Sequence, residues 1–265
     1  MFTTTALLLS LPAHALSCTS IQVGATLPAD GAVSVPVNAL PTVELYLEQP
    51  LEHVQLELMT DEGVRVEAEQ VVLTGGDPLL VQLQPVETLE EDREYAIVVN
   101  EVYGSGELFR VSEVGFRTGV DVDLEPPEDA DIARVRHDVA LDGEWGDVYD
   151  LRVHIDGGQD PSGAMFRIEL SDDSDFSNPI ERIRLASPAL ISHGLCTGDE
   201  AARLEVDDMW MRVTPIDVAG NTGTAAVREP VEDSDKEGGC NHISASQLGW
   251  LGVLMGLIGA LRRSQ

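Results

Sequence analysis

Oxygen-rich side chains crowd one short segment, residues 171–178, where aspartates and serines surround a single phenylalanine. Carboxylate oxygens are ligands that Ca²⁺ prefers, so this segment could hold the ion through Asp172, Asp173 and Asp175. The glycine and the distal glutamate of an EF-hand loop are missing. The same residues suit an ordinary turn between two strands. The sequence therefore favours a turn, with Ca²⁺ as the alternative, and indicates no other cofactor.

The sequence gives weaker evidence for other metal sites and for catalytic residues. His193 and Cys196 offer two zinc-type ligands, but no second pair stands at a suitable spacing. Serine, histidine and aspartate occur without a Gly-x-Ser-x-Gly elbow. Paired carboxylates are frequent in so acidic a chain, so they do not point to a glycosidase. The sequence predicts no catalytic residues and no enzyme, with an unrecognised hydrolase as a minor alternative.

The chain carries a large excess of negative charge, with 47 acidic against 16 basic residues and a formal net charge of −31. Such a charge repels phosphate backbones, so we expect no nucleic-acid partner. A large negative charge also keeps a protein soluble, which is the explanation we favour for the acidic excess. The alternative explanation is that the acidic residues bind cations at the surface. Hydrophobic residues make up 43% of the chain and alternate with charged ones, which argues against disorder.

Apolar and polar residues alternate with period two from Ile21 to Val231, with turn residues at short intervals. This pattern is typical of strands half-buried in a sandwich. The clearest expected strands are 42–48, 54–58, 64–69, 80–83, 95–99, 133–136, 149–155, 165–170 and 210–216. We predict an all-β fold of two tandem Ig-like/fibronectin-like β-sandwiches, residues 18–120 and 132–231. The acidic, proline-containing segment 121–131 is the expected linker.

The first sandwich carries a recognisable pattern. A Pro-Ala-Asp-Gly turn at 28–31 precedes a short strand ending in Val35-Pro36, and a Leu89-to-Tyr95 spacing precedes Phe-Arg-Thr-Gly at 116–119. Residues 28–119 thereby resemble a bacterial Ig-like domain of surface-layer and adhesin-type proteins. The loop at 103–106 departs from the usual turn of that family. The resemblance implies a sandwich that belongs to a surface protein.

The end of the second sandwich, residues 210–221, places a tryptophan on a strand before an Asp-x-Ala-Gly-Asn turn. This arrangement resembles the F–G hairpin of fibronectin type III and related modules. The resemblance implies that Trp210 fills the core. Gly220 and Asn221 suit left-handed backbone angles, so the turn needs no functional explanation.

The N-terminus has the features of a secretion signal. A short apolar run at 6–12 precedes Ala13-His14-Ala15, which fits the A-x-A cleavage rule. A second cleavage position follows Ser17, immediately before Cys18. No lysine or arginine precedes the apolar run. We expect residues 1–17 to form a signal helix that is removed during export.

The C-terminus contains an apolar segment, residues 248–261, which stops at Arg262-Arg263. It is shorter than the ~20 residues of a full membrane span, but extension back to Ile243 nearly suffices. The terminal arginines would stay in the cytoplasm, which leaves the sandwiches outside. We therefore expect a polar linker at 232–247 and a hydrophobic helix in the tail at 248–265.

A Gly-Gly-Cys entry at 238–240, Trp250 in the apolar helix and the basic terminus resemble the MYXO-CTERM type of sorting signal of myxobacteria and their relatives. The resemblance implies a sorting and processing protease as a partner, lipid attachment at Cys240 and retention at the cell surface. The basic cluster is shorter than usual, which bears on processing more than on membrane insertion.

The remaining cysteines allow one disulfide. If Cys240 belongs to the sorting tail, Cys18 and Cys196 form an even pair in an oxidising compartment. Their bond would require the two sandwiches to fold back on each other. A bond between Cys196 and Cys240 is the competing possibility.

These features together predict a non-enzymatic exported protein at the outer membrane or cell surface of a Gram-negative bacterium, periplasmic before processing. It would be a structural stalk or an adhesive module with an unknown extracellular protein or glycan partner, held to the membrane by its tail. The alternative is a secreted accessory module that binds glycan or peptide for an extracellular enzyme system.

Overall fold

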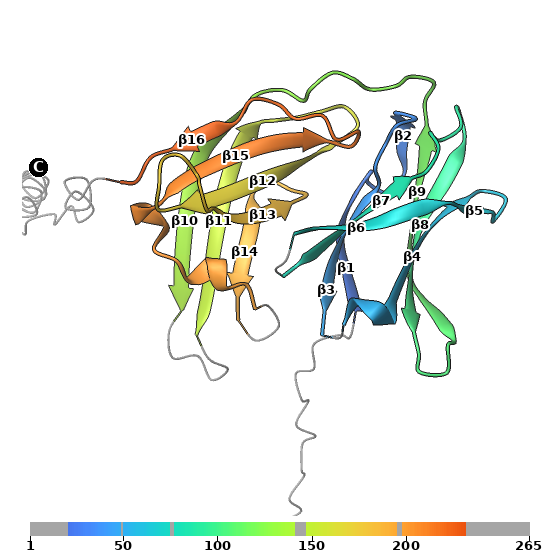
Figure 1. Ribbon diagram of the computed structural model, residues 1–265, viewed down its shortest axis with the longest axis horizontal. Coiled ribbons are helices and arrows are strands. Elements are labelled where there is room, and N and C mark those ends of the chain that lie inside the picture. Colours follow the sequence, from blue (N-terminus) through green and yellow to red (C-terminus); the bar gives the residue numbers. More distant parts are fainter. Residues whose placement is uncertain (1–20, 49, 75–76, 141–146, 195–197, 232–265) are drawn as a thin grey trace, which may run out of the picture. The chain divides into compact units, whose positions relative to one another are not determined.

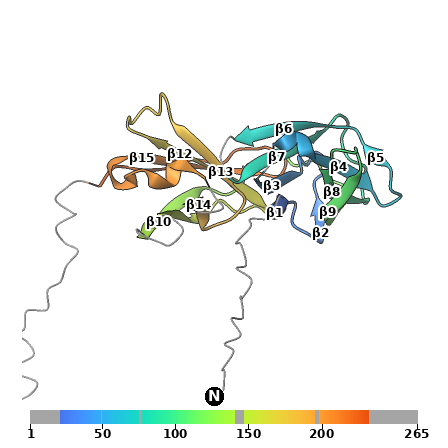
Figure 2. The same cartoon turned by 90° about the horizontal axis from the view of Figure 1, so that it is seen from below.

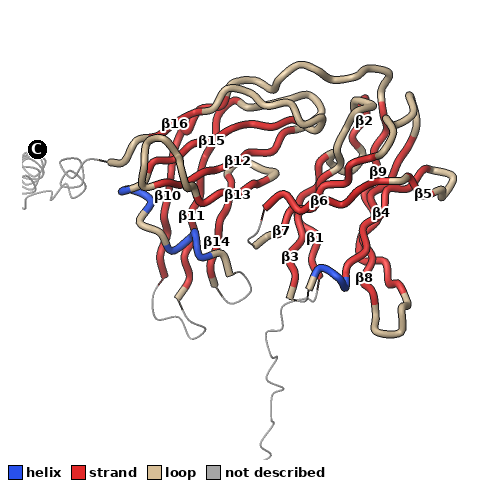
Figure 3. The backbone as a smooth tube through the Cα atoms, viewed as in Figure 1, coloured by secondary structure: helices blue, strands red, loops and turns tan. Residues whose placement is uncertain are grey.

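The described part of the chain is built almost wholly of β-strands. The computed structural model describes residues 21–231, except 49, 75–76, 141–146 and 195–197. Strands dominate and the helices are short 3₁₀ turns, as Figure 3 shows. The predicted all-β class is confirmed. The predicted signal helix and C-terminal hydrophobic helix lie outside the described residues, and among those residues no helix is long and apolar enough to cross a membrane.

The first sandwich consists of two sheets (Figure 1). One sheet has the order β1-β3-β7-β6 and the other the order β2-β9-β8-β4-β5. Their strands are β1 (Ile21–Leu27), β2 (Ala32–Val35), β3 (Thr42–Leu47), β4 (Val54–Thr60), β5 (Arg65–Val66), β6 (Ala68–Thr74), β7 (Leu79–Pro85), β8 (Glu94–Val102) and β9 (Leu108–Thr118), with a 3₁₀ turn η1 (Leu51–His53) before β4.

The second sandwich also has two sheets, β10-β11-β14 and β13-β12-β15-β16. In Figure 2, β10 and β14 form a separate layer from β12 and β15. The strands are β10 (Ala130–Ala140), β11 (Val148–Gly157), β12 (Ala164–Ser171), β13 (Ile180–Arg184), β14 (Ala189–His193), β15 (Trp210–Asp217) and β16 (Ala226–Arg228). Two 3₁₀ turns, η2 (Glu200–Arg203) and η3 (Val206–Asp208), lie between β14 and β15.

The alternating pattern located most of the strands, because every second side chain of a half-buried strand faces the core. In β4, Val54, Leu56 and Leu58 are buried and their neighbours are partly exposed. The segment expected as one strand at 64–69 is instead two. It leaves the sheet of β4 after Val66 and pairs with β7 from Ala68, so the chain changes sheet at a corner.

The pattern that resembles bacterial Ig-like domains serves the packing of the first sandwich. Leu89, Tyr95 and Phe116 are all buried, and the two aromatic rings stack with centroids 5.7 Å apart. The Tyr95 hydroxyl accepts a hydrogen bond from the backbone N–H of Glu90 at 2.8 Å. This bond ties the incoming loop to β8, so the pattern is explained by core packing.

Trp210 does not fill the core, contrary to the expectation from the fibronectin-like hairpin. It is only partly buried, whereas Met211 and Val213 are fully buried. Alternation along β15 therefore places Trp210 on the opposite face of the sheet. The turn after this strand is as expected, with Gly220 at φ +89°, although Asn221 does not adopt a left-handed angle.

The segment between the sandwiches is held by backbone hydrogen bonds. The N–H of Val37 donates to the carbonyl of Asp121 at 3.0 Å, and the N–H of Glu128 donates to the carbonyl of Gln159 at 3.1 Å. β10 begins at Ala130, two residues before the predicted start of the second sandwich. By backbone contacts both sandwiches belong to one unit, Met1–Glu229.

Candidate functional site

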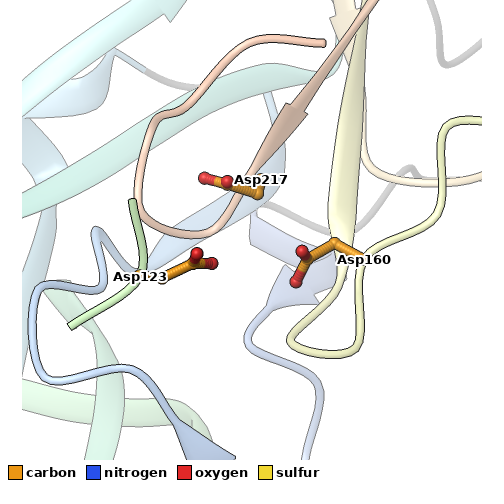
Figure 4. Close-up of side chains that lie close together, drawn as sticks. All are labelled: Asp123, Asp160 and Asp217. Carbon is orange, nitrogen blue, oxygen red and sulfur yellow. The ribbon is translucent and has the colours of Figure 1, made fainter. Parts of the chain in front are cut away.

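Three carboxylates from distant parts of the sequence come together where the two sandwiches join. Asp123 lies in the connecting segment, Asp160 in the loop between β11 and β12, and Asp217 at the end of β15 (Figure 4). Each offers an oxygen, and these oxygens lie within 4.8 Å of one another. They are the only such group of three acidic, histidine or cysteine ligands among the described residues. We call them the aspartate cluster.

Each member of the cluster caps its own turn. The Asp217 carboxylate accepts the N–H groups of Ala219 and Asn221 and the Asn221 side-chain amide, each at 2.8 Å. Asp160 accepts the N–H of Ser162 at 2.7 Å, and Asp123 accepts that of Glu125 at 3.1 Å. Donors therefore satisfy some of the carboxylate lone pairs without any cation.

Burial makes Asp217 the unusual member, since its exposed fraction is 0%. Removal from water raises the pKa of this carboxyl, and the negative charge of Asp123 raises it further. The hydrogen bonds from Asn221 and Ala219 act in the opposite direction and favour the ionised form. An ionised Asp217 at neutral pH therefore carries a free-energy cost that its donors only partly offset.

The chemistry of the aspartate cluster is that of a hard-cation ligand set, because Ca²⁺ takes about 6–8 oxygen ligands. The cluster supplies three carboxylates, already engaged in capping turns. The sequence could not locate it, because the three residues are far apart in the chain and only the fold brings them together. Asp217 was visible only as part of a turn motif.

The sequence placed a Ca²⁺ candidate elsewhere, at Asp172, Asp173 and Asp175. In the structure these residues are exposed in the turn after β12. The Asp175 carboxylate accepts the N–H of Ser177 at 3.0 Å, and the Asp173 carbonyl accepts that of Phe176 at 3.2 Å. They do not form a three-carboxylate group, and the turn explanation accounts for their contacts.

A second polar cluster also crosses between the sandwiches. Arg184 on β13 is 3% exposed, and its guanidinium donates to the Asp199 carboxylate at 3.1 Å. It also donates to the carbonyl of Asp77 in the first sandwich at 3.1 Å. Asp199 is held from its other side by Arg182, through two hydrogen bonds of 2.6 Å. The bidentate pair fixes Asp199 in the position that Arg184 needs.

Two acidic side chains of the first sandwich complete this contact. The Glu44 carboxylate, 8% exposed, accepts the N–H of Ala25 at 3.2 Å and that of Leu185 at 3.3 Å. The Asp77 carboxylate accepts the N–H of Gly198 at 3.2 Å. Each therefore bonds directly to the second sandwich. We call Glu44, Asp77, Arg184 and Asp199 together the clasp.

Burial shifts the pKa of two clasp groups. Removal from water lowers the pKa of Arg184, and the charges of Asp199 and Glu44 oppose this shift. Burial also raises the pKa of Asp77, while its hydrogen bond from Gly198 lowers it. Removing one partner from such a set leaves a buried charge without compensation, which typically costs about 3–5 kcal/mol.

Apolar contacts reinforce the clasp. Met165, Ile183, Ile216 and Val218 of the second sandwich belong to the same buried cluster as the core of the first. The backbone N–H of Leu40 donates to the carbonyl of Val218 at 2.7 Å. The core of the first sandwich therefore extends across the junction to these four residues, while the rest of the second sandwich has a core of its own.

Two glycines permit the close approach of the sandwiches. A Cβ atom at Gly163 would lie 2.4 Å from Cδ1 of Leu27, and one at Gly220 would lie 3.2 Å from Cδ1 of Leu40. Both glycines also have positive φ angles, +97° and +89°. Side chains at these positions would push against the first sandwich.

Some of the remaining predicted residues lie outside the described part of the chain, and others lie within it. Ala15, Ser17, Cys18, Cys196 and Cys240 lie outside the described residues, so the cleavage, disulfide and lipid-attachment assignments stay predictions. His193 is described, and its Nδ1 atom lies 3.5 Å from Oε1 of Glu200. Tyr149 packs against the rings of His137 and His193, and Arg203 lies over its ring. These contacts leave Tyr149 partly buried on β11.

Comparisons with known proteins found no matching family model and no matching curated protein. Solved structures similar to this chain include a DUF4785 family protein from Legionella pneumophila, at 16% identity with a TM-score of 0.24, covering 81% of this chain and 57% of that one. The N-terminal part of the bacterial S-layer protein SbsC matches at 13% identity and a TM-score of 0.25, covering 81% and 45%.

The fibronectin(III)-like modules of CbhA from Clostridium thermocellum match at 10% identity with a TM-score of 0.24, over 84% of this chain and 99% of that one. This chain thus spans about half the length of the Legionella and S-layer structures. At these scores the similarities carry no argument about activity or partners. The class rests on the sheets themselves, which form two Ig-like/fibronectin-like sandwiches.

Proposed function

We propose that this protein is a non-enzymatic, exported surface protein whose two sandwiches act as a stalk or adhesive module, held at the cell surface by the C-terminal tail. The observation that carries the structural part is the junction. A stalk must keep its modules in a fixed arrangement, and here a buried apolar cluster with residues of both sandwiches and the clasp join them.

The contacts of the buried charged side chains support a structural role. Arg184, Asp199 and Glu44 are each buried and each bonded to the backbone or to an opposite charge within the junction. Asp217 is buried and its carboxylate accepts three hydrogen bonds in its own turn. Buried titratable groups are often a sign of an active site, but these are committed to holding the fold.

The exported location is proposed from the sequence of the two ends. The apolar run and A-x-A site at the front are typical of a secretion signal. The Gly-Gly-Cys entry and the apolar tail are similar to a sorting signal that retains proteins at the surface. The acidic character of the chain suits a protein that must stay soluble outside the cell.

Cell fractionation tests this proposal. Cells that have a sorting system of this type would express the full chain, a chain truncated before Cys240 and a Cys240→Ser variant, with Ser244→Ala as the matched control. Mass spectrometry of each fraction would locate the protein and define its mature ends. We expect the full chain and the control at the surface, and the truncated chain in the medium or periplasm.

The Cys240→Ser variant separates lipid attachment from simple insertion, because it should lose surface retention only if Cys240 carries the anchor. Surface retention of the truncated chain, or release of the full chain, would show that the tail is not the anchor. Recovery of the full chain in the cytoplasm with residues 1–17 intact would refute export.

A further inference from the structure

The arginines of this acidic chain are almost all neutralised. Every arginine in the described residues lies in an ion pair with a carboxylate, with the exception of Arg134 on β10. Arg134 is also exposed to solvent. In a chain with so many more acidic than basic residues, an arginine without a carboxylate partner is unexpected.

Two further arginines lie close to Arg134 in the same pair of strands. In the β10–β11 ladder Arg134 lies opposite His154, and Arg136 lies opposite Arg152. Directly paired residues share a face of the sheet, and the intervening Val135 and Val153 face the core. All four basic side chains therefore occupy the outer face of the sheet. We call Arg134, Arg136, Arg152 and His154 the arginine patch.

This arrangement costs stability, because like charges directly opposite each other in a sheet repel. Only one end of the patch is compensated. Arg152 contacts Asp138 at 2.6 Å and Asp150 at 2.7 Å, whereas Arg136 is 3.8 Å from the same Asp138. The Arg134 guanidinium thus remains without a carboxylate partner, and that of Arg136 shares Asp138 with Arg152.

The patch is also small. Asp131 and Asp156 are paired opposite each other on the same face beyond Arg134, and Asp138 and Asp150 are paired at the other end. Neighbouring strands are about 4.8 Å apart and alternate residues about 7 Å apart, so the patch accommodates roughly one anionic group at a time. Flanking carboxylates would repel a partner that carries closely spaced negative charges.

From this charge pattern we propose that the arginine patch is a docking site for an acidic polysaccharide, one that carries a single carboxylate or sulfate group per sugar. Guanidinium groups bind carboxylate and sulfate oxygens through paired hydrogen bonds, which supplies the attraction. The exposed Leu190 lies opposite Arg152 on β14 and offers an apolar surface beside the charges for a sugar ring.

The low charge density of such a polysaccharide makes it a better partner for the arginine patch than an acidic protein. A protein partner would cover the aspartate pairs at both ends of the patch and meet the net charge of −31 over a wide area. A chain of singly charged sugars touches the patch locally, and at physiological salt the remaining charges are screened beyond about 8 Å. This inference rests on the proposed surface location for its biological setting, but not for its test.

Binding of the purified full chain to two soluble polymers tests the site directly. Polygalacturonate carries one carboxylate per sugar, dextran sulfate carries sulfate groups, and neutral dextran is the uncharged control. Affinity would be measured in about 150 mM and about 500 mM NaCl, because the repulsion from the rest of the chain is screened at both and a charge-based contact weakens with salt. We expect binding to one or both acidic polymers that weakens at the higher salt, and none to neutral dextran.

Two double variants locate the contact. Arg134→Gln/Arg136→Gln removes two charges from the patch, and we expect about tenfold weaker binding, equivalent to roughly 1.4 kcal/mol. Arg110→Gln/Arg117→Gln removes two exposed charges from the first sandwich and should change affinity less than about twofold. Circular dichroism would verify that both variants remain folded.

The inference would be overturned by any of three results. These are no binding to either acidic polymer at the lower salt, equal binding to neutral dextran, or equal losses in the two double variants. None of them bears on the proposed surface location, which fractionation tests separately.

Discussion

At the scale of single residues, buried charges dominate the energetics of this molecule. Burial and the nearby negative charge of Asp123 both raise the pKa of Asp217, so ionisation of this carboxyl at neutral pH costs free energy. A carboxyl whose pKa is raised in the folded state stabilises the fold fully below its unfolded pKa, and this contribution is lost as pH rises through the folded pKa. Near neutral pH the aspartate cluster is therefore a local source of instability.

Asp123→Asn should make the protein more stable at pH 7. The change removes the like charge nearest to Asp217 and keeps an oxygen that can accept the N–H of Glu125. We expect a gain of about 1 kcal/mol, or roughly 2–4 °C in melting temperature. The gain should disappear as pH falls through the raised pKa of Asp217, where that carboxyl becomes neutral.

Glu87→Gln is the control for this prediction, since it removes one exposed negative charge elsewhere in the first sandwich. It should shift the melting temperature by much less. A lower melting temperature for Asp123→Asn at pH 7 would instead mean that the Asp123 carboxylate makes a favourable interaction, such as with a bound cation.

Arg184→Met should be strongly destabilising. It leaves the buried carboxylate of Asp199 with one cation fewer and the carbonyl of Asp77 without its donor. We expect a loss of about 3–5 kcal/mol in urea unfolding. Arg65→Met removes the exposed cation of an ion pair with Glu57, with an N–O distance of 3.6 Å, and should cost at most about 1 kcal/mol. Similar losses for both variants would contradict the role of the clasp.

Neither the clasp nor the aspartate cluster could be predicted from the sequence. In so acidic a chain every arginine has many potential partners, and nothing in the spacing selects Asp199 for Arg184. Carboxylates of the aspartate cluster come from three separate segments. The segment rich in aspartate, 171–178, attracted attention because local density is visible in a sequence, whereas proximity created by folding is not.

At the scale of the elements, the alternation of apolar and polar residues predicted a strand reliably where one face of that strand is buried and the other is exposed to solvent. It identified β3, β4, β8, β11 and β12. It did not identify β1, β9, β13, β14 or β16, which are short or have mixed burial patterns. The expectation that Trp210 lies in the core came from the resemblance to the fibronectin-type hairpin, whereas the alternation along β15 puts Met211 there.

The loop between β11 and β12 provides a test of how closely the sandwiches pack. Gly163→Ala adds a methyl group that would meet Leu27 of the first sandwich, at a backbone φ of +97°. We expect a loss of about 1–3 kcal/mol from steric overlap and backbone strain. Combining it with Leu27→Val should recover part of the loss, with a coupling of about 0.5 kcal/mol or more.

Gly63→Ala is the matched control for backbone strain alone. Gly63 has a positive φ of +75° but no atom within 4 Å of the added methyl position. Its loss should not depend on Leu27. If the Gly163→Ala and Leu27→Val effects were simply additive, the two side chains would not be in contact and the described junction would be wrong.

At the scale of the whole molecule, the central claim is that the two sandwiches form one structural body. One buried apolar cluster includes residues of both sandwiches, and the clasp places charged groups of each sandwich against the other. Domains that share a large buried interface unfold together, whereas domains joined only by a linker unfold separately. Cooperativity of unfolding therefore reports the junction directly.

Differential scanning calorimetry of the full chain is the most direct measurement. We predict a single transition for the two sandwiches, with equal calorimetric and van't Hoff enthalpies, and two resolved transitions in Arg184→Met. Two independent transitions in the wild-type chain, unchanged by Arg184→Met, would contradict the account, because each sandwich would then be stable without the other.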